Sequence, residues 1–130
     1  MSEKLLGIVN ELYTALGNQD WETYKSHLHP DFQVVESDSL PFAGTFKGME
    51  GFNVLFGNII DKFSGFEPTP THTCVGDNHV MVWVDIKLTS RETNKVLETE
   101  LIEVFVFKDD KLIEMRPFYF DPNAVHSILS

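Results

Sequence analysis

The stretch TELIEVFVF, from Thr99 to Phe107, decides the fold class of this 130-residue chain. Side chains of a strand alternate between two faces, so one face carries Glu103 among apolar side chains (Leu101, Phe105 and Phe107) and the other is wholly apolar (Ile102, Val104 and Val106). A strand that is apolar on both sides must be covered on both sides. We therefore expect helices on one face and, on the other, a further layer or a second subunit, of which a homodimer is the simpler solution.

The rest of the second half of the chain has the same period of two. The run from His79 to Thr89 places Val80 and its alternate neighbours on one face, and Met81, Trp83 and Asp85 on the other. Further runs of this kind cover residues 67–75, 96–107 and 112–120, with short polar turns between them. The pattern predicts antiparallel strands that follow one another as a meander.

The first half of the chain has helical spacing instead. Apolar residues recur in steps of three and four within residues 5–16 and again within 52–63, and a short helix is expected from Trp21 to Leu28 between Asp20 as N-cap and Pro30. A strand over residues 32–36, a loop over 37–51 with one short strand near Thr45, and a last helical turn within 123–129 complete the prediction. Helices first and an antiparallel sheet afterwards predict a single α+β domain over residues 1–130, with the helices on one face of the sheet.

Composition and charge exclude several classes of partner. Twenty acidic against ten basic residues give a net charge of −10, which disfavours nucleic acid and anionic membranes as partners. Cys74 is the one cysteine, which suits a reducing compartment, and neither a secretory signal nor an apolar run of ~20 residues is apparent. We expect a cytoplasmic protein.

Glu103 is the first candidate for a functional site, because it is an ionisable group among hydrocarbon side chains. Two interpretations stay open. If the turn at residues 108–111 closes symmetrically, Arg116 falls opposite Glu103 and the two form a structural ion pair; otherwise Glu103 is a functional carboxyl. The first interpretation predicts a lowered pKa and the second a raised one.

Glu36 ends a strand whose Phe32 and Val34 share its face, so it is a second carboxylate that projects inward, and Asp38 follows it. Glu36 and Glu103 together form a possible acid and base pair. Tyr13 lies beside the apolar stripe of the first helix, where its ring packs inward and its hydroxyl reaches either the surface or a cavity.

Other motifs of catalysis are missing from the sequence. The five histidines lack the spacing of metal ligands, so no metal is predicted. His72 shares a face with Cys74, but an idle thiol is the commoner case for such a pair. Gly44, Gly48 and Gly51 do not form a phosphate-binding loop, and no cofactor is predicted.

Several local phrases recur in one known family: YTAL at residues 13–16 with NQDW at 18–21, HPDF at 29–32, FAGTFKGMEG at 42–51, ELIEVFVF at 100–107 and LIEMRPFYFD at 112–121. In their order and spacing the whole chain resembles the SnoaL-like branch of the nuclear transport factor 2-like superfamily, which also contains ketosteroid isomerase. The resemblance implies a cone-shaped roll, in which a strongly curved sheet wraps helices around a deep apolar pocket. It also implies that the outer face of the sheet pairs with a second subunit.

The resemblance further implies roles for the two glutamates. Glu36 falls near the general base of the ketosteroid isomerase relatives, and Glu103 falls at the position of the protonated acid that binds the developing oxyanion. Ketosteroid isomerase is a standard example of carboxyls whose pKa values are tuned by their surroundings. The family's oxyanion tyrosine falls nearer Leu12 than Tyr13, which argues against steroid isomerisation. Leu101 stands where the epoxide hydrolase relatives have an arginine, so their reaction is not expected. A cyclase-like role stays possible.

Three functions are therefore compared. In the first, Glu103 is a neutral hydrogen-bond donor and Glu36 an ionised base, acting on a small apolar carbonyl compound. In the second, the pocket only binds a ligand; its expected lining is Tyr13, Trp83, Phe105, Arg116, Phe118 and Tyr119, with Glu103 held by Arg116. In the third, the exposed apolar sheet is an interaction module and the pocket is closed.

Overall fold

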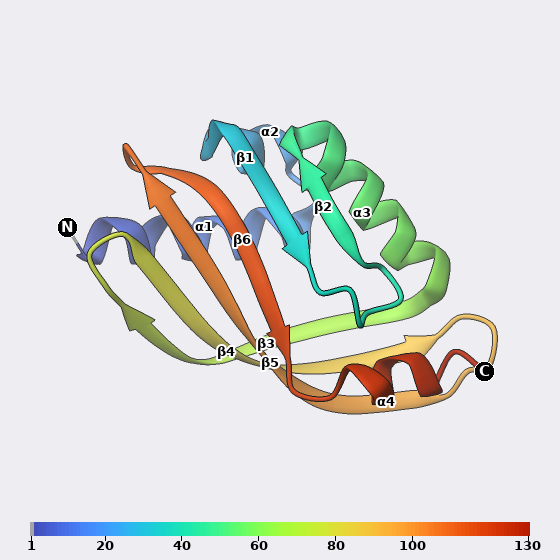
Figure 1. The fold of residues 1–130 in the computed structure, drawn as a ribbon. Helices are drawn as coiled ribbons and strands as arrows, with labels where there is room; N and C mark the ends of the chain where they lie inside the picture. The colour runs from blue at the N-terminus through green and yellow to red at the C-terminus, as the bar shows by residue number, and fades with distance from the viewer. Residues whose placement is uncertain (1) are drawn as a thin grey trace.

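Figure 1 shows the computed structural model, which describes residues 2–130. Within these residues the elements are α1 (Ser2–Asn18), α2 (Trp21–Ser26), β1 (Leu28–Glu36), β2 (Gly44–Lys47), α3 (Gly48–Lys62), β3 (Phe63–Val75), β4 (His79–Ser90), β5 (Val96–Lys108), β6 (Lys111–Tyr119) and α4 (Pro122–Ser127). The strands form one sheet in the order β2-β1-β6-β5-β4-β3, antiparallel throughout except for the β1–β6 pair. The sheet is curved and open, with α1 behind it and α3 beside β1 and β2 (Figure 1). The predicted α+β class and the meander from β3 to β6 are confirmed.

The core lies between the inner face of the sheet and the helices. Alternate residues of β4 from Val80 to Leu88 are at most 2% exposed, whereas Met81 and Trp83 on the other face are each 46% exposed. This alternation confirms the predicted faces of β4, and it leaves an apolar outer surface with no helix on it. Leu12 of α1 and Phe52 of α3 fill the inner side.

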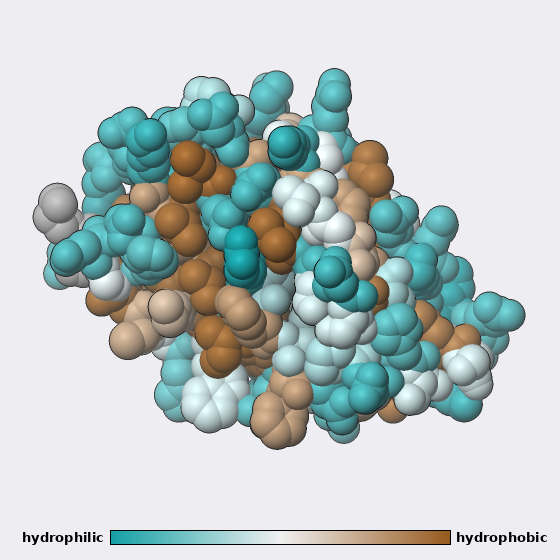
Figure 2. Space-filling model, viewed as in Figure 1, coloured by the Kyte–Doolittle hydropathy of each residue, from teal (hydrophilic) through white to brown (hydrophobic). Residues whose placement is uncertain are grey.

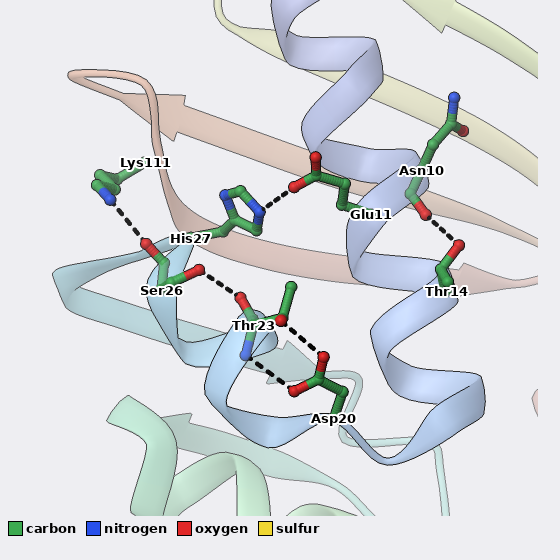
Figure 3. A network of polar contacts seen from close by, with 8 residues as sticks. All are labelled: Asn10, Glu11, Thr14, Asp20, Thr23, Ser26, His27 and Lys111. Atoms are coloured by element: carbon green, nitrogen blue, oxygen red, sulfur yellow. Dashed lines mark hydrogen bonds and ion pairs between the residues drawn. The ribbon is translucent and has the colours of Figure 1, made fainter.

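A polar network fixes the hairpin of α1 and α2 (Figure 3). Asp20 accepts hydrogen bonds from the amide of Thr23 at 3.2 Å and from its hydroxyl at 2.6 Å, so it is the N-cap of α2 as the sequence predicts. His27, just after α2, lies 2.5 Å from the Glu11 carboxylate of α1. Lys111 donates to the carbonyl of Ser26 at 2.7 Å and joins α2 to the start of β6.

Two helix boundaries differ from the prediction. The second helix ends at Ser26 instead of Leu28, because His27 uses its carbonyl to bind the amide of Leu112 at 2.8 Å and the chain enters β1 there. Pro30 therefore lies within β1. The third helix begins at Gly48 instead of Phe52, and Gly48 has a φ of 67°, a left-handed conformation that glycine adopts without strain.

The register of β5 against β6 is not the symmetric one. Asp109 and Asp110 form the tight turn, with φ values of 54° and 59° as a type I′ turn requires. A bulge between Val106 and Phe107 then adds one residue to β6. The pairs beyond the bulge, from Val106–Glu114 to Leu101–Tyr119, are shifted by one residue. Glu103 consequently faces Pro117, and the predicted pairing of Glu103 with Arg116 is wrong.

Among the helices that the structure describes, none is long and apolar enough to span a membrane.

Candidate functional site

Two buried glutamates lie on the strands that flank β6. Glu36, the last residue of β1, is 6% exposed, and Glu103, in β5, is 9% exposed. Glu103 pairs with Pro117 of β6, and Glu36 lies two residues beyond Val34, which pairs with Met115. Both carboxyls therefore approach Pro117 on the inner face from opposite sides. Neighbouring strands are about 4.8 Å apart, so the two backbones are separated by roughly 10 Å, a gap that two glutamate side chains largely close.

Tyr13 of α1 joins this site. Its hydroxyl donates a hydrogen bond of 2.5 Å to Oε1 of Glu103, and its ring meets Phe105 edge-on with centroids 5.8 Å apart. Of the two positions that the sequence leaves open for the Tyr13 hydroxyl, the structure has the inward one. The short bond is of the strong kind that a carboxylate makes with an O–H donor.

One carboxyl oxygen in the site is unpaired. Oε1 of Glu36 is buried and has no hydrogen-bond partner among residues 2–130. Buried polar atoms are almost always hydrogen-bonded, so an oxygen without a protein partner marks strain or a place for an ordered water or a ligand. The side chain of Glu36 is inside the fold, as the sequence predicts from the face that it shares with Phe32 and Val34.

The pKa values of the two buried carboxyls are shifted by different surroundings. Burial, together with the charge of Glu103, raises the pKa of Glu36 to about 9. Burial also raises the pKa of Glu103, while the hydrogen bond from Tyr13 lowers it. Glu36 therefore keeps its proton at neutral pH, and Glu103 is the carboxyl that has a hydrogen-bond donor, the Tyr13 hydroxyl, beside it. The raised pKa of Glu103 agrees with the functional interpretation and not with an ion pair.

Two further phenols surround the carboxyls. Tyr24 of α2 is buried, its hydroxyl lies 3.8 Å from the sulfur of Met115, and burial with the charge of Glu103 raises its pKa. Burial and the charges of both glutamates raise the pKa of Tyr119 on β6. The sequence gives Tyr24 only as part of a helical stripe, and its place beside Glu103 depends on how α2 packs, which no local pattern records.

Three residues expected in the interior are on the outer face or turn towards it. Trp83 points outward and donates to Glu100 at 2.7 Å, and Phe118 is 56% exposed. Arg116 pairs with Glu114 at 3.0 Å, so its guanidinium does not neutralise Glu103. The odd-numbered residues of β6 face inward after the bulge, which turns Phe118 and Arg116 outward. Phe105 is buried on the inner face as expected.

A cleft of about 300 Å³ opens where β1 and β6 end. Its lining consists of Val35, Ser37, Leu40, Arg116, Pro117, Phe118, Tyr119 and Pro122. Of the predicted ligand contacts, Arg116, Phe118 and Tyr119 therefore share one cleft, whereas Tyr13, Trp83 and Phe105 are not part of it. A second cleft of about 240 Å³ lies between α1 and α2, beside Thr14 and Thr23.

Metal ligands do not gather anywhere in residues 2–130: no three His, Cys, Asp or Glu side chains there are placed to hold an ion. The polar groups of the candidate site are the carboxyls of Glu36 and Glu103 and the phenol of Tyr13. These groups donate, accept and move protons.

Comparison with known proteins finds a matching family for the chain. Residues 9–115 match the SnoaL-like domain. No curated protein matches the chain.

Solved structures share the fold at low identity. A putative SnoaL-like polyketide cyclase from Jannaschia sp. CCS1 is 19% identical, with 99% of this chain and 93% of that chain covered and a TM-score of 0.84. TerC, co-crystallised with polyporic acid, is 19% identical over 97% of this chain and 98% of its own, with a TM-score of 0.87. A hypothetical protein from Catenulispora acidiphila DSM 44928 with a ketosteroid isomerase-like fold, in complex with trimethylamine, is 12% identical over 86% and 84% of the two chains, with a TM-score of 0.72.

These matches confirm the resemblance drawn from the sequence phrases, both for the SnoaL-like branch and for the ketosteroid isomerase-like fold. Because the match to the SnoaL-like domain spans residues 9–115, this protein belongs to the SnoaL-like domain family.

Proposed function

We propose that the protein is a cofactor-independent acid–base enzyme that moves a proton on a small apolar carbonyl compound. The observation that carries the proposal is the pair of buried glutamates, one with an unpaired oxygen and the other bonded to Tyr13 at 2.5 Å. A structural pair of carboxyls with no cation beside it destabilises a fold, so a function accounts for it better. The match to the SnoaL-like domain, and the shared fold of a structure described as a putative SnoaL-like polyketide cyclase, support this class of reaction.

We infer that Glu103 ionises before Glu36, because Tyr13 donates a hydrogen bond to Glu103 and Oε1 of Glu36 has no partner among residues 2–130. This order reverses the roles taken from the resemblance. Glu36, with its pKa raised to about 9, is the neutral acid whose O–H donates to the carbonyl oxygen of the substrate. Glu103 is the base: Tyr13 occupies Oε1, and Oε2 accepts the proton from the carbon next to the carbonyl. The electron pair of that C–H bond moves to the carbonyl oxygen, and the enolate is stabilised by the Glu36 O–H. Return of the proton from Glu103 to the same or another carbon closes the cycle.

The test is hydrogen exchange into a simple ketone. β-Tetralone in D2O exchanges its α-hydrogens slowly, and NMR follows the loss of their signal. We expect the protein to accelerate this exchange, Glu103→Gln to lower the rate by about a hundredfold or more, and the exposed Glu98→Gln to leave it unchanged. Exchange at the buffer rate while the ketone binds would leave the alternative, a non-catalytic ligand-binding protein.

We also propose a homodimer formed through the outer face of the sheet. Figure 2 shows apolar side chains gathered over β5 and β6 on the face turned away from α1. The pairs Met81–Val104, Trp83–Ile102 and Ile102–Phe118 make this apolar surface continuous across three strands. Exposed apolar patches of this kind mark interfaces. The cytoplasmic location expected from the single cysteine stays a prediction.

A further inference from the structure

Phe120, the residue after β6, carries a large apolar side chain that the fold leaves in solvent. It is 84% exposed, the highest value among the large apolar residues that the structure describes. Its amide donates to the carbonyl of Glu100 at 3.0 Å, so the ladder between β5 and β6 continues to this position. Because side chains of a strand alternate, Phe120 stands out from the same outer face as Phe118.

The cleft of about 300 Å³ opens on this face, next to the exposed ring. Val35, beside the inward-facing Glu36 in β1, turns outward and lines the cleft, and most of the remaining lining is apolar. Two lining residues, Phe118 and Pro122, lie two positions before and two positions after Phe120 in the chain. A cavity of about 150 Å³ admits benzene, so a phenyl ring fits the cleft.

The cleft belongs to the backbone and does not depend on one side-chain conformation. The pairing of β1 with β6 ends at Val34 and Met115. The amide of Phe120 points to β5, and amides alternate along a strand, so the odd residues of β6 turn their amides towards β1. Pro117 is one of them and has no amide hydrogen, so the two strands separate there.

A second copy of the chain brings ring and cleft together if a twofold axis crosses β6 at Phe118. A twofold contact is isologous: residue i meets residue j of the partner, and j meets i. With two sheets face to face and the axis roughly at right angles to β6, positions equally far from Phe118 on either side meet. Arg116, in the cleft wall, then faces Phe120 of the partner subunit, and each copy inserts one ring and receives one.

The charges of the outer face favour this axis over one that runs along β6. An axis along β6 places each residue against its own copy, so the half-exposed side chain of Arg116 meets the partner's Arg116, and like charges oppose association. The crossing axis brings Arg116 to a phenyl ring and to the partner's Glu100, both of which attract a guanidinium. Within one chain Arg116 pairs with Val104, four residues from Glu100, so this attraction arises only between copies.

We propose that Phe120 of each subunit inserts into the partner's cleft between β1 and β6, and that these two contacts fix the homodimer about a twofold axis at Phe118. The proposal rests on the homodimer proposed above, and it adds which residue anchors that dimer and how the copies are oriented. The cleft is then a site for protein and not for substrate. The acid–base function is tested separately by hydrogen exchange into β-tetralone.

The first experiment measures the dissociation constant of the dimer by analytical ultracentrifugation. Phe120→Ala removes an exposed ring and leaves the core of each subunit intact, and we expect the dissociation constant to rise about a hundredfold, because both contacts are lost. Val54→Ala, at an exposed site on α3, is the matched control and keeps the wild-type value. A Phe120→Ala dimer as strong as the wild type contradicts the anchor and not the homodimer, whereas a monomeric wild type contradicts both.

The second experiment reads the orientation of the copies. Phe120→p-azidophenylalanine keeps an aromatic ring at this position and links it to its neighbours on illumination. In a mixture of isotope-labelled and unlabelled chains, mass spectrometry separates links between copies from links within one chain. We expect links between copies from position 120 to the cleft residues Val35 or Ser37. Links from position 120 to its own copy indicate the axis along β6 and overturn the proposal, as do links found only within a chain.

Discussion

The hydroxyl of Tyr13 in α1 donates a 2.5 Å hydrogen bond to Oε1 of Glu103, which lies 90 residues further along the chain on the inner face of β5. This contact ties the first helix to the sheet at the one place where β5 carries a carboxyl inside the core. It also separates the two glutamates chemically, because Glu103 has a donor and Glu36 has none among the described residues.

Removing that donor makes Glu103 harder to ionise. In Tyr13→Phe the bond that lowers the pKa of Glu103 is lost while burial remains, so we expect this pKa to rise. The rise of the exchange rate with pH, which follows the ionisation of Glu103, then occurs at higher pH. Measuring the rate of β-tetralone exchange over a series of pH values tests this. Tyr24→Phe is the matched control, since that phenol is bonded to the Met115 sulfur and not to a carboxyl. Similar shifts in both variants would contradict the role given to Tyr13.

The exchange rate should depend on pH as a bell. It rises as Glu103 loses its proton, above the usual range of a glutamate, and falls as Glu36 loses its own at about 9. Glu36→Gln retains an N–H donor but no proton to lose, so we expect it to be slower by about tenfold or more and to lack the alkaline limb. An alkaline limb that survives in Glu36→Gln would show that another group causes it.

The outer face gives a prediction about assembly. If two copies pair through the sheet, Trp83→Glu puts a charge in the contact, and we expect light scattering after size exclusion to show monomers where the wild type shows dimers. Val54→Glu is the control, because Val54 is 58% exposed on α3, away from this face. A wild-type protein that is monomeric at all accessible concentrations contradicts the homodimer.

Much of the fold follows from the sequence, because the period at which apolar residues recur in a strand shows which face of that strand is buried. The alternation in β4 and β5 identifies the inner face, and with it the burial of Glu103. The inward position of Glu36 follows from Phe32 and Val34 by the same rule. These are properties of single strands, so each can be predicted from the sequence of that strand alone.

The contacts between strands were harder to predict. The bulge after Val106 adds Ile113 to β6 without any glycine or proline to mark it, and a shift of one residue exchanges the faces of Arg116 and Pro117. For the same reason the sequence misplaces Phe118, which belongs to the outer face. The proposed order of ionisation is equally hidden from the sequence, because it depends on the contact between Glu103 and Tyr13, two residues from distant segments.

The free energy of unfolding should fall as the pH rises. Carboxylates that form ion pairs with cations show the opposite behaviour. Glu36 has a pKa of about 9 in the folded protein and an ordinary glutamate value when unfolded, so between these values the folded state holds a proton that the unfolded state has lost. The stabilisation is complete below the unfolded pKa and is lost as the pH rises towards the folded one, by about 1.4 kcal/mol per pH unit for each retained proton. Urea unfolding at about pH 5 and about pH 8 measures the difference.

Glu36→Gln isolates this contribution, since the amide keeps the shape of the side chain and does not ionise. We expect the variant to unfold at a higher urea concentration than the wild type at about pH 8 and to show a weaker dependence on pH, whereas Glu98→Gln, at an exposed site on β5, follows the wild type. Such a result would mean that the Glu36 carboxyl lowers the stability of the fold at about pH 8 and that its replacement raises it. The carboxyl would then be kept for its chemistry and not for stability. If Glu36→Gln instead lowers stability at both pH values, the side chain is a structural group, and the acid–base function loses its donor.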